Sequence, residues 1–485
     1  MSVPPNIVLI ATDQWRGDAV GYREGAAVIT PHLDKLALRS TIFERCISNS
    51  PLCVPARAAI MTGQLPRESG VWSNARAADV DGPSHVRSMR DAGYFTAVIG
   101  KTHLWRTGPG PKPGLHAKTM DHILAAWGFM HRVEVNDPIG TGSQGCAYTD
   151  YATEHGFIDS HRKYINEWID EMRSRNATPW AQPPSPAPKY KDIDSFIGRT
   201  GAEWLRSYDK SQPFYLQVQF TGPHDPYDGP DDFRSLYQDK EIDIGITAMV
   251  ENPPLIVKPR LDSRSPIVRA TNEQRRQWRI NYYANISLID YWIGEILEAL
   301  HKSGFDDNTW VLFTSDHGEM LGDLGLMGKT VYFEPSIHIP LLIRSPGATP
   351  QKTDRLVQQA DITNTLLDIS AVEGFNDSLG QSLKPIVSGN SPKDAQKAVI
   401  SELFGESTVI TDRYKLTVKT ETNEPSQFID RQETPDESRN SVDDPGSASI
   451  QKELVERYFE PLKARIDQGR MSRYRDYVKR TGRLN

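Results

Sequence analysis

Ionisable side chains follow four short apolar segments of the chain, each at the point where the segment ends. They are Asp13 after residues 6–11, Lys101 and His103 after residues 95–99, His224 after residues 214–220, and Asp316 and His317 after residues 309–313. If these segments are strands of one α/β sheet, the side chains lie beyond its carboxyl edge, where such sheets bind ligands. Carboxylates, imidazoles and an amine at one place can bind a cation, hold an anion and transfer protons.

Two of these residues, Asp13 and Asp316, are carboxylates in equivalent positions. Each aspartate taken alone also fits a turn or a helix cap. Two carboxylates at one edge repel each other unless a cation lies between them, and His317 adds an imidazole donor. The set therefore favours a metal site. Its oxygen-rich composition favours Ca²⁺, Mg²⁺ or Mn²⁺ over Zn²⁺, and the histidine makes Mg²⁺ less suitable than Ca²⁺ or Mn²⁺.

Cys53 opens a Cys-x-Pro-x-Arg motif that ends at Arg57 and runs into helix-forming residues 58–61. A helix N-terminus and an arginine both stabilise an anion at this cysteine. A free cysteine is most often a small buried hydrophobic residue, and the motif by itself fixes only three positions. Its combination with the residues at the strand ends is the stronger indication of a catalytic site.

The elements that must position these side chains alternate between strand and helix. Buried strands typical of a parallel sheet are predicted at residues 6–11, 95–99, 214–220, 309–313 and 339–343. Helices are predicted from Thr30 and Pro31 onward, at about 84–92 and at about 273–303. This order predicts an α/β fold with a large, mixed, mostly parallel sheet between two layers of helices.

The rest of the chain is less regular. Residues 104–190 are rich in Gly, Pro and His and are predicted to be an insertion of loops and short helices that sets substrate selectivity. We expect a catalytic domain over residues 1–370 and a smaller C-terminal α+β subdomain over residues 371–485. Within the subdomain, strands are predicted at 398–404 and 414–419, a loop at 421–447, a helix interrupted by Pro461 at 450–465, and a basic tail at 463–485.

Composition excludes several classes of protein. The chain has 485 residues, of which 38% are hydrophobic and 25% charged, and its net charge is −7. These values predict a globular protein whose main partner is neither nucleic acid nor an anionic membrane. No apolar run approaches the ~20 residues of a membrane span, no signal peptide is recognisable, and three cysteines do not form a disulfide framework. We therefore expect a cytoplasmic protein.

Taken together, the motifs resemble the sulfatase family of the alkaline-phosphatase superfamily, and within it the choline-sulfatase and phosphonate-monoester-hydrolase-like branch. The segments that carry the resemblance are residues 6–14, 30–34, 53–63, 93–94, 100–104, 223–227, 314–319, 328–329 and 339–341, with a weaker similarity over 428–437. The family implies an alkaline-phosphatase-like fold. It also implies that a separate formylglycine-generating enzyme oxidises Cys53 to formylglycine, whose hydrate is the nucleophile.

The resemblance implies a role for each candidate residue. One divalent cation would be bound by Asp13, Asp316, His317 and the modified Cys53. The sulfuryl oxygens would be held by Arg57, Lys101 and Lys329, protons would be moved by His103 and by His224 or Lys329, and Asn74 would lie near the substrate. On their own, Lys101 also fits a solvated lysine, while His224 and Asn74 also fit turn residues.

Three positions depart from the common pattern of the family. Many members have two adjacent aspartates after the first strand, whereas Thr12 precedes Asp13 here. The motif usually contains serine where this chain has Ala56, and His317 stands where many sulfatases have asparagine. The combination of Asp13, Asp316 and His317 is similar to the branch named above.

The predicted reaction is hydrolysis of a sulfate monoester, such as a carbohydrate sulfate, with release of inorganic sulfate. One alternative is hydrolysis of phosphonate monoesters or phosphodiesters, which also carry one negative charge at the reacting group. The other is a non-catalytic protein that binds oxyanions with an unmodified Cys53. The basic tail, opposite in sign to the rest of the chain, predicts a homo-oligomer in which the tail crosses the interface.

Overall fold

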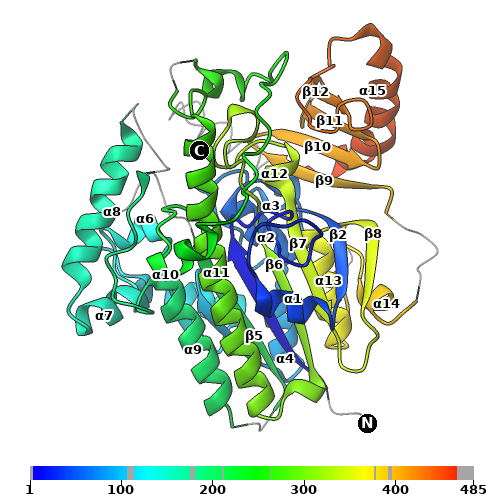
Figure 1. Cartoon of the computed structure of the whole chain (residues 1–485). Coiled ribbons are helices and arrows are strands. Elements are labelled where there is room, and N and C mark those ends of the chain that lie inside the picture. The colour runs from blue at the N-terminus through cyan, green and yellow to red at the C-terminus, as the bar shows by residue number, and fades with distance from the viewer. Residues whose placement is uncertain are drawn as a thin grey trace.

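A computed structural model of the chain describes residues 4–105, 114–174, 181–209, 212–263, 265–375, 378–390 and 396–466. Its centre is an eight-stranded sheet in the order β4-β3-β5-β1-β6-β7-β2-β8 (Figure 1). The strands are β1 (Asn6–Asp13), β2 (Thr41–Ile47), β3 (Phe95–Gly100), β4 (His131–Glu134), β5 (Phe214–Pro223), β6 (Thr309–Ser315), β7 (His338–Arg344) and β8 (Gln351–Gln358). The predicted large, mixed, mostly parallel sheet is confirmed.

The central strands are parallel, and their carboxyl ends therefore lie at one edge of the sheet. β1 pairs in parallel with both β5 and β6, and β3 pairs in parallel with β5. All eight residues of β1 are buried because helices cover both faces of the sheet. The expectation that residues 339–343 belong to a parallel set is wrong, because β7 runs antiparallel to β6 and to β2.

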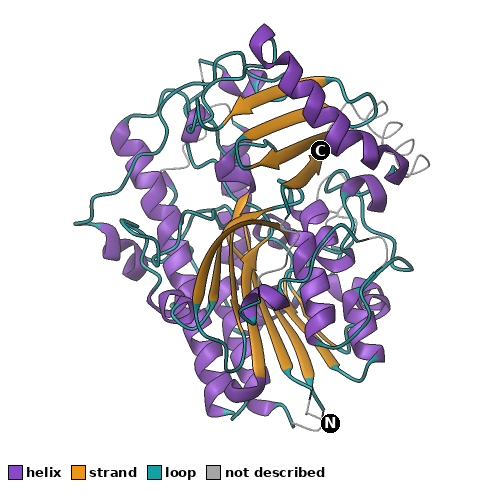
Figure 2. Ribbon diagram, turned by 90° about the vertical axis from the view of Figure 1, so that its right-hand side faces the viewer, coloured by secondary structure: helices purple, strands orange, loops and turns teal. Residues whose placement is uncertain are grey.

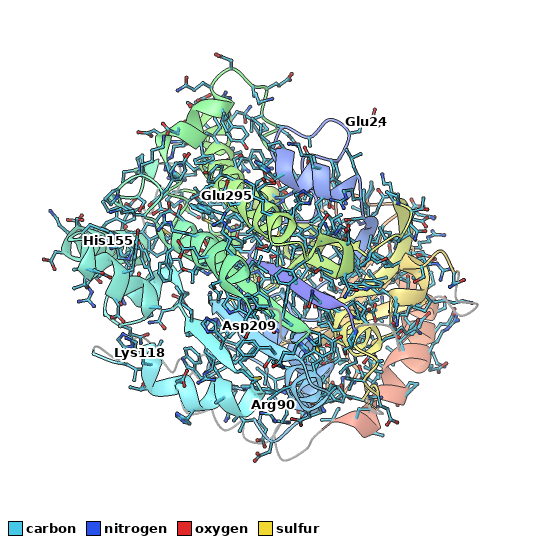
Figure 3. The ribbon with its side chains drawn as sticks, turned by 90° about the horizontal axis from the view of Figure 1, so that it is seen from below. Glu24, Arg90, Lys118, His155, Asp209 and Glu295 are labelled. Carbon is cyan, nitrogen blue, oxygen red and sulfur yellow. The ribbon has the colours of Figure 1, made fainter. Side chains whose placement is uncertain are left out.

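Helices cover the two faces. On one face, α1 (Pro31–Ala37), α9 (Ile193–Ser207) and α11 (Asn272–Lys302) pack together, and on the other α2 (Cys53–Thr62), α4 (His85–Asp91) and α13 (Gln359–Ile369) do so. Seen from below, the helices lie on both sides of the strands, and labelled charged side chains such as Arg90 and Lys118 lie at the periphery (Figure 3). No helix in the described part of the chain is both long and apolar enough to cross a membrane.

The predicted insertion at 104–190 contains short helices, as expected, but it also supplies β4, which pairs with β3 at the edge of the large sheet. The other α-helices of the described residues are α3 (Pro66–Ser69), α5 (Asp121–Trp127), α6 (Pro138–Thr141), α7 (Ala147–Glu154), α8 (Ile158–Arg173), α10 (Asp231–Arg234), α12 (Glu334–Ile337), α14 (Lys384–Val387) and α15 (Ala448–Leu454). The insertion is therefore part of the sheet as well as a cover over it.

A second, four-stranded antiparallel sheet follows in the C-terminal region, in the order β12-β11-β10-β9. Its strands are β9 (Ala398–Leu403), β10 (Glu406–Thr411), β11 (Tyr414–Lys419) and β12 (Pro425–Asp430). It stands over the carboxyl ends of the large sheet's parallel strands, with α15 beside it (Figures 1 and 2). The prediction of a loop over 421–447 is wrong where β12 forms, because β12 pairs with β11 through a turn of only a few polar residues.

The helix predicted at 450–465 is interrupted, as Pro461 suggested. α15 ends at Leu454, a wide helical turn covers Val455–Phe459, and a tight turn follows at Glu460–Arg465. Most of the basic tail, from residue 467 onward, lies outside the described residues.

Two buried ion pairs lie at the junction between the small sheet and the catalytic region. Arg67, on α3, donates to Glu402 of β9 and to the hydroxyl of Ser407. Lys415, on β11, is paired with Glu437. A buried charge is costly without a partner, so these pairs fix how the small sheet docks.

Candidate active site

Four buried side chains meet beyond the carboxyl ends of β1 and β6. Asp13, Cys53, Asp316 and His317 each offer a ligand atom, and these atoms all lie within 4.8 Å of one another. Two carboxylates, an imidazole and the position of a modifiable cysteine form a donor set suited to a hard divalent cation. The residues predicted as metal ligands are therefore brought together, and they fit such an ion.

Cys53 is the first residue of α2, and Gly63 in a left-handed conformation ends this helix. Its side chain is only 1% exposed. Its Sγ lies 3.2 Å from His317 Nε2, 3.2 Å from Lys329 Nζ and 3.7 Å from Asp13 Oδ1. The helix N-terminus points at the same atom, which adds partial positive charge to that of the side chains.

The electrostatic environment of Cys53 is strongly positive. Burial raises the pKa of the thiol, but Lys329, Lys101 and His317 outweigh burial and hold the pKa of Cys53 well below its usual value. Because a thiolate is stabilised only where the local potential is positive, the sulfur marks an anion-binding position.

Arg57 lies one helical turn after Cys53 and contacts both metal-site carboxylates. Its Nε donates to Asp316 Oδ2 over 2.9 Å, and one Nη donates to Asp13 Oδ2 over 3.1 Å. The other Nη donates to the carbonyl oxygen of Lys101. These contacts hold the two carboxylates in place, whereas the predicted role of Arg57 in holding sulfuryl oxygens stays a prediction.

Lys101 and His103 lie on the turn after β3. Lys101 is buried, and its Nζ donates to Asp13 Oδ2 over 2.6 Å. The turn begins at Gly100, where a Cβ atom would lie 2.0 Å from the carbonyl oxygen of Gln219, so only glycine fits. His103 has a positive φ of 55° and is buried, and neither ring nitrogen has a hydrogen-bond partner among the described residues. An unpartnered buried imidazole is costly, which is the property expected of a group that acts on a substrate.

His224 follows β5, as predicted. Its Nδ1 lies 2.8 Å from the carbonyl oxygen of Asp225 and 3.3 Å from Asp225 Oδ1. Burial lowers the pKa of His224, but Asp225, Asp13 and Cys53 together outweigh burial and raise the pKa to about 9. The imidazole therefore carries a proton at neutral pH.

Among the site residues, Lys329 has the least support from the sequence. In the structure its Nζ lies 3.2 Å from Cys53 Sγ. Its Nζ also donates to Gln14 Oε1 over 2.6 Å. Gln14 in turn donates from Nε2 to Glu319 Oε2 over 2.5 Å. Sequence reasoning assigned no role to Gln14, Glu319 and Asp225, although all three lie within the segments that carry the family resemblance, and that position was the available signal.

Asn74 lies at the start of α2, beside Cys53. Its Oδ1 accepts a hydrogen bond of 3.1 Å from the backbone N–H of Val54. This contact caps the helix that carries Cys53, and the predicted contact of Asn74 with a substrate stays a prediction.

The comparisons with known proteins agree with this geometry. A model of the sulfatase family matches residues 5–372. The chain belongs to the sulfatase family. A second model, which describes the C-terminal part of N-sulphoglucosamine sulphohydrolase, matches residues 322–464 of this sulfatase.

Individual relatives indicate which members of the family this sulfatase is similar to. It is 32% identical over 399 residues to a choline-sulfatase of Rhizobium meliloti, a match that covers 79% of this chain and 72% of that protein. It is 28% identical over 474 residues to a ulvan-active sulfatase of Formosa agariphila, covering 93% and 79%. The solved phosphonate monoester hydrolase of Agrobacterium radiobacter has a TM-score of 0.75 at 23% identity, covering 96% of each chain, and confirms the alkaline-phosphatase-like fold. The family and the sulfatase relatives indicate a sulfuric ester hydrolase.

Proposed function

We propose that the chain hydrolyses a sulfate monoester to an alcohol and inorganic sulfate, with the hydrate of formylglycine made from Cys53 as the nucleophile. The observation that carries the proposal is the convergence of Lys329, His317 and a helix N-terminus on the sulfur of Cys53. Such an arrangement suits an anionic group that reacts at residue 53. The conversion of Cys53 requires a formylglycine-generating enzyme as a maturation partner.

Asp13, Asp316, His317 and residue 53 would hold one divalent cation, for which we propose Ca²⁺ or Mn²⁺. When bound, the cation supplies positive charge that favours ionisation of the nucleophilic hydroxyl. Arg57 stabilises this site, because it donates hydrogen bonds to both carboxylates and keeps them oriented.

Two lysines face the reacting group. Lys101 lies on the turn after β3 and Lys329 lies before α12, and both act electrostatically on residue 53. Burial lowers the pKa of Lys329, but Cys53 and Asp13 outweigh burial and raise it, so the amine stays charged. Preorganised cations of this kind neutralise the sulfuryl oxygens without needing to rearrange during the reaction.

Two histidines supply the proton transfers. His224 carries a proton at neutral pH and would donate it to the leaving alkoxide, a poor leaving group without protonation. Lys329 is the other group placed for this role. His103, whose ring nitrogens have no partner in the described part of the chain, would accept the proton released when sulfate leaves residue 53.

A carbohydrate sulfate is the substrate class that we propose. One relative that covers most of this chain is named a ulvan-active sulfatase. The insertion after His103, which adds β4 and several short helices beside the site, offers a surface large enough for an extended alcohol.

Two measurements test the proposal. The mass of the tryptic peptide covering residues 46–57 should show conversion of the thiol-bearing carbon of Cys53 into an aldehyde. A panel of sulfate, phosphonate and phosphodiester esters, assayed on the converted and metal-loaded enzyme, should give the highest kcat/KM with a sulfate ester. Preference for a phosphonate or phosphodiester would replace the proposed substrate class, and an unmodified Cys53 in protein that turns over sulfate esters would refute the proposed nucleophile.

A further inference from the structure

The short segment of residues 329–334 connects the catalytic site to the C-terminal sheet. It starts at Lys329, whose Nζ lies 3.2 Å from Cys53 Sγ, and it ends at Glu334, the first residue of α12. An error in the path of this segment would displace the lysine amine from residue 53. The contacts of the segment therefore decide how accurately Lys329 is placed.

The backbone of this segment is strained next to the lysine. Thr330 has a φ of 73°, in the left-handed region. For a β-branched residue this conformation is a true outlier. Such a conformation persists only where surrounding contacts over-determine it.

Four hydrogen bonds with sequence-distant residues hold the backbone of the segment. The N–H of Thr330 donates to the carbonyl oxygen of Pro51 over 3.0 Å, next to the start of α2, and Arg260 donates to the carbonyl oxygen of Lys329 over 2.9 Å. Lys415 Nζ donates to the carbonyl oxygen of Tyr332 over 2.9 Å, and the N–H of Glu334 donates to Glu437 Oε2 over 2.6 Å. Two of these four bonds thus come from the C-terminal subdomain.

Lys415 and Glu437 form a closed buried pair. Lys415 is fully buried and Glu437 is 2% exposed, and the two side chains bond each other directly. Lys415 Nζ also lies 3.6 Å from Glu334 Oε2. Ile429 of β12 lies in the same apolar cluster as Val331 and Phe333. A fully buried lysine is expensive, and here both members of the pair also bond the segment that carries Lys329.

We propose that Lys415 and Glu437 are positioning residues that act on the active site through Lys329. They clamp residues 329–334, so that the lysine amine stays at residue 53 and at Gln14. The consequence for catalysis rests on the proposed function, whereas the clamp itself does not.

The test variant must keep the buried charge balanced, because removal of one partner alone would unfold the junction. Lys415→Met/Glu437→Gln removes both charges and leaves an amide oxygen at position 437 that can accept from the N–H of Glu334. The matched control is Arg413→Met/Asp430→Asn, which removes the 2.7 Å ion pair between Arg413 and Asp430. That pair belongs to the same small sheet, and it makes no contact with residues 329–334 within the part of the chain that the structure describes.

The first readout is hydrogen exchange of the peptide that covers residues 329–334, which needs no activity. We expect faster exchange in the clamp variant and unchanged exchange in the control. Unchanged exchange in a folded clamp variant would overturn the proposal.

The second readout is binding of inorganic sulfate to the metal-loaded protein by calorimetry. The clamp variant should raise the Kd for sulfate about tenfold, and Lys329→Met should raise it by at least as much. In the Lys329→Met background the clamp variant should have no further effect, because the clamp acts through that lysine. If the effects of the clamp variant and of Lys329→Met on the Kd for sulfate were fully additive, the clamp would have a merely structural role and the proposal would be overturned.

The two proposals fail in different ways. If the wild-type enzyme turns over no sulfate ester while exchange and sulfate binding behave as expected, the proposed function is wrong and the clamp stands. If sulfate esters are turned over and the clamp variant has the kcat/KM of the control, the clamp is wrong and the proposed function stands.

Discussion

The chain buries charge in two regions, and it balances the charge differently in each. At the junction with the small sheet, Arg67 pairs with Glu402 and Lys415 pairs with Glu437, one cation for each carboxylate. At the carboxyl edge of the large sheet, four basic groups make ion pairs with three carboxylates. The basic groups are Arg57, Lys101, Lys329 and the protonated His224, and the carboxylates are Asp13, Asp316 and Asp225.

The difference separates a structural use of buried charge from a functional one. A balanced pair needs no further partner, whereas an excess of buried positive charge is costly until an anion arrives. The lowered pKa of Cys53 reports this excess at the place where the substrate would react. The excess therefore predicts where an anionic group binds, and it predicts that changes in the two regions have different effects.

The largest effect is expected at the centre of the positive region. Cys53→Ala removes the proposed precursor of the nucleophile and should lower kcat by ~10⁴-fold or more, with no loss of fold. The measurement is turnover of a sulfate ester together with the thermal midpoint.

Cys46→Ala is the matched control for Cys53→Ala, since Cys46 is also fully buried but lies on β2, outside the group of metal-site residues. It should cost about 1 kcal/mol of stability and leave kcat/KM unchanged. Near-wild-type activity of Cys53→Ala would exclude the proposed nucleophile.

Removal of the divalent cation should have the next largest effect. Chelation should lower kcat by roughly 10³-fold, because the cation supplies several kcal/mol of charge stabilisation. It should also lower the thermal midpoint, since a ligand that binds only the folded state stabilises that state. Readdition of Ca²⁺ or Mn²⁺ should restore both. Active protein that contains no divalent cation by elemental analysis would rule out this site.

A smaller effect, on stability alone, is expected in the balanced region. Glu402→Gln leaves Arg67 buried without its charge partner and should cost about 3–5 kcal/mol of unfolding free energy. Arg67→Met/Glu402→Gln removes both charges and should recover much of this loss. Both variants should keep the wild-type kcat/KM below their melting temperatures, and a fall of tenfold or more would show that this pair also acts on the site.

The sequence predicted the positive region better than the balanced one, for a physical reason. Asp13, Lys101, His224 and Asp316 each follow a buried strand, so local patterns and the geometry of parallel sheets were enough to bring them to one edge. Whether each acts as assigned stays a prediction.

The junction has no comparable local signal. Lys415 precedes β12 in the sequence and pairs with Glu437, which follows β12. Glu402 pairs with Arg67, which lies 335 residues earlier in the chain. Such pairs form only when separate segments of the chain fold against each other. The antiparallel direction of β7 was missed for a similar reason, because a fully buried strand has the same apolar pattern in either direction.

A third region, around a cavity next to His224, avoids a buried charge because a carboxyl group in it is protonated. A small cavity there is lined by Tyr148, His161, Asp192, Asp194, His224 and Asp228, among others. Asp194 Oδ1 accepts hydrogen bonds of 2.8 and 3.0 Å from the N–H and hydroxyl of Thr221, and of 3.1 Å from the N–H of Gly222. Burial, helped by the neighbouring Asp192, raises the pKa of Asp194 to about 7.

The last prediction follows from the raised pKa of Asp194, and its expected effect is the smallest. The carboxyl is protonated more readily in the folded than in the unfolded state. Its contribution to stability is therefore full below pH 3.8 and is lost as the pH rises through about 7. Asp194→Asn keeps an oxygen as acceptor and cannot ionise. Its unfolding free energy, relative to that of the wild type, should therefore rise by about 2–3 kcal/mol between pH 5 and pH 8.

Urea unfolding of Asp194→Asn at several pH values measures this difference, and the exposed Asp170→Asn is the control. The titratable groups that line the cavity with Asp194 are Asp192, Asp228, Tyr148, His161 and His224. Within the described residues no cation forms an ion pair with Asp194, whereas Arg57 and Lys101 both bond Asp13. A pH-independent difference between the asparagine variant and the wild type would mean that Asp194 is ionised in the folded state, and that this region also pairs its buried charge.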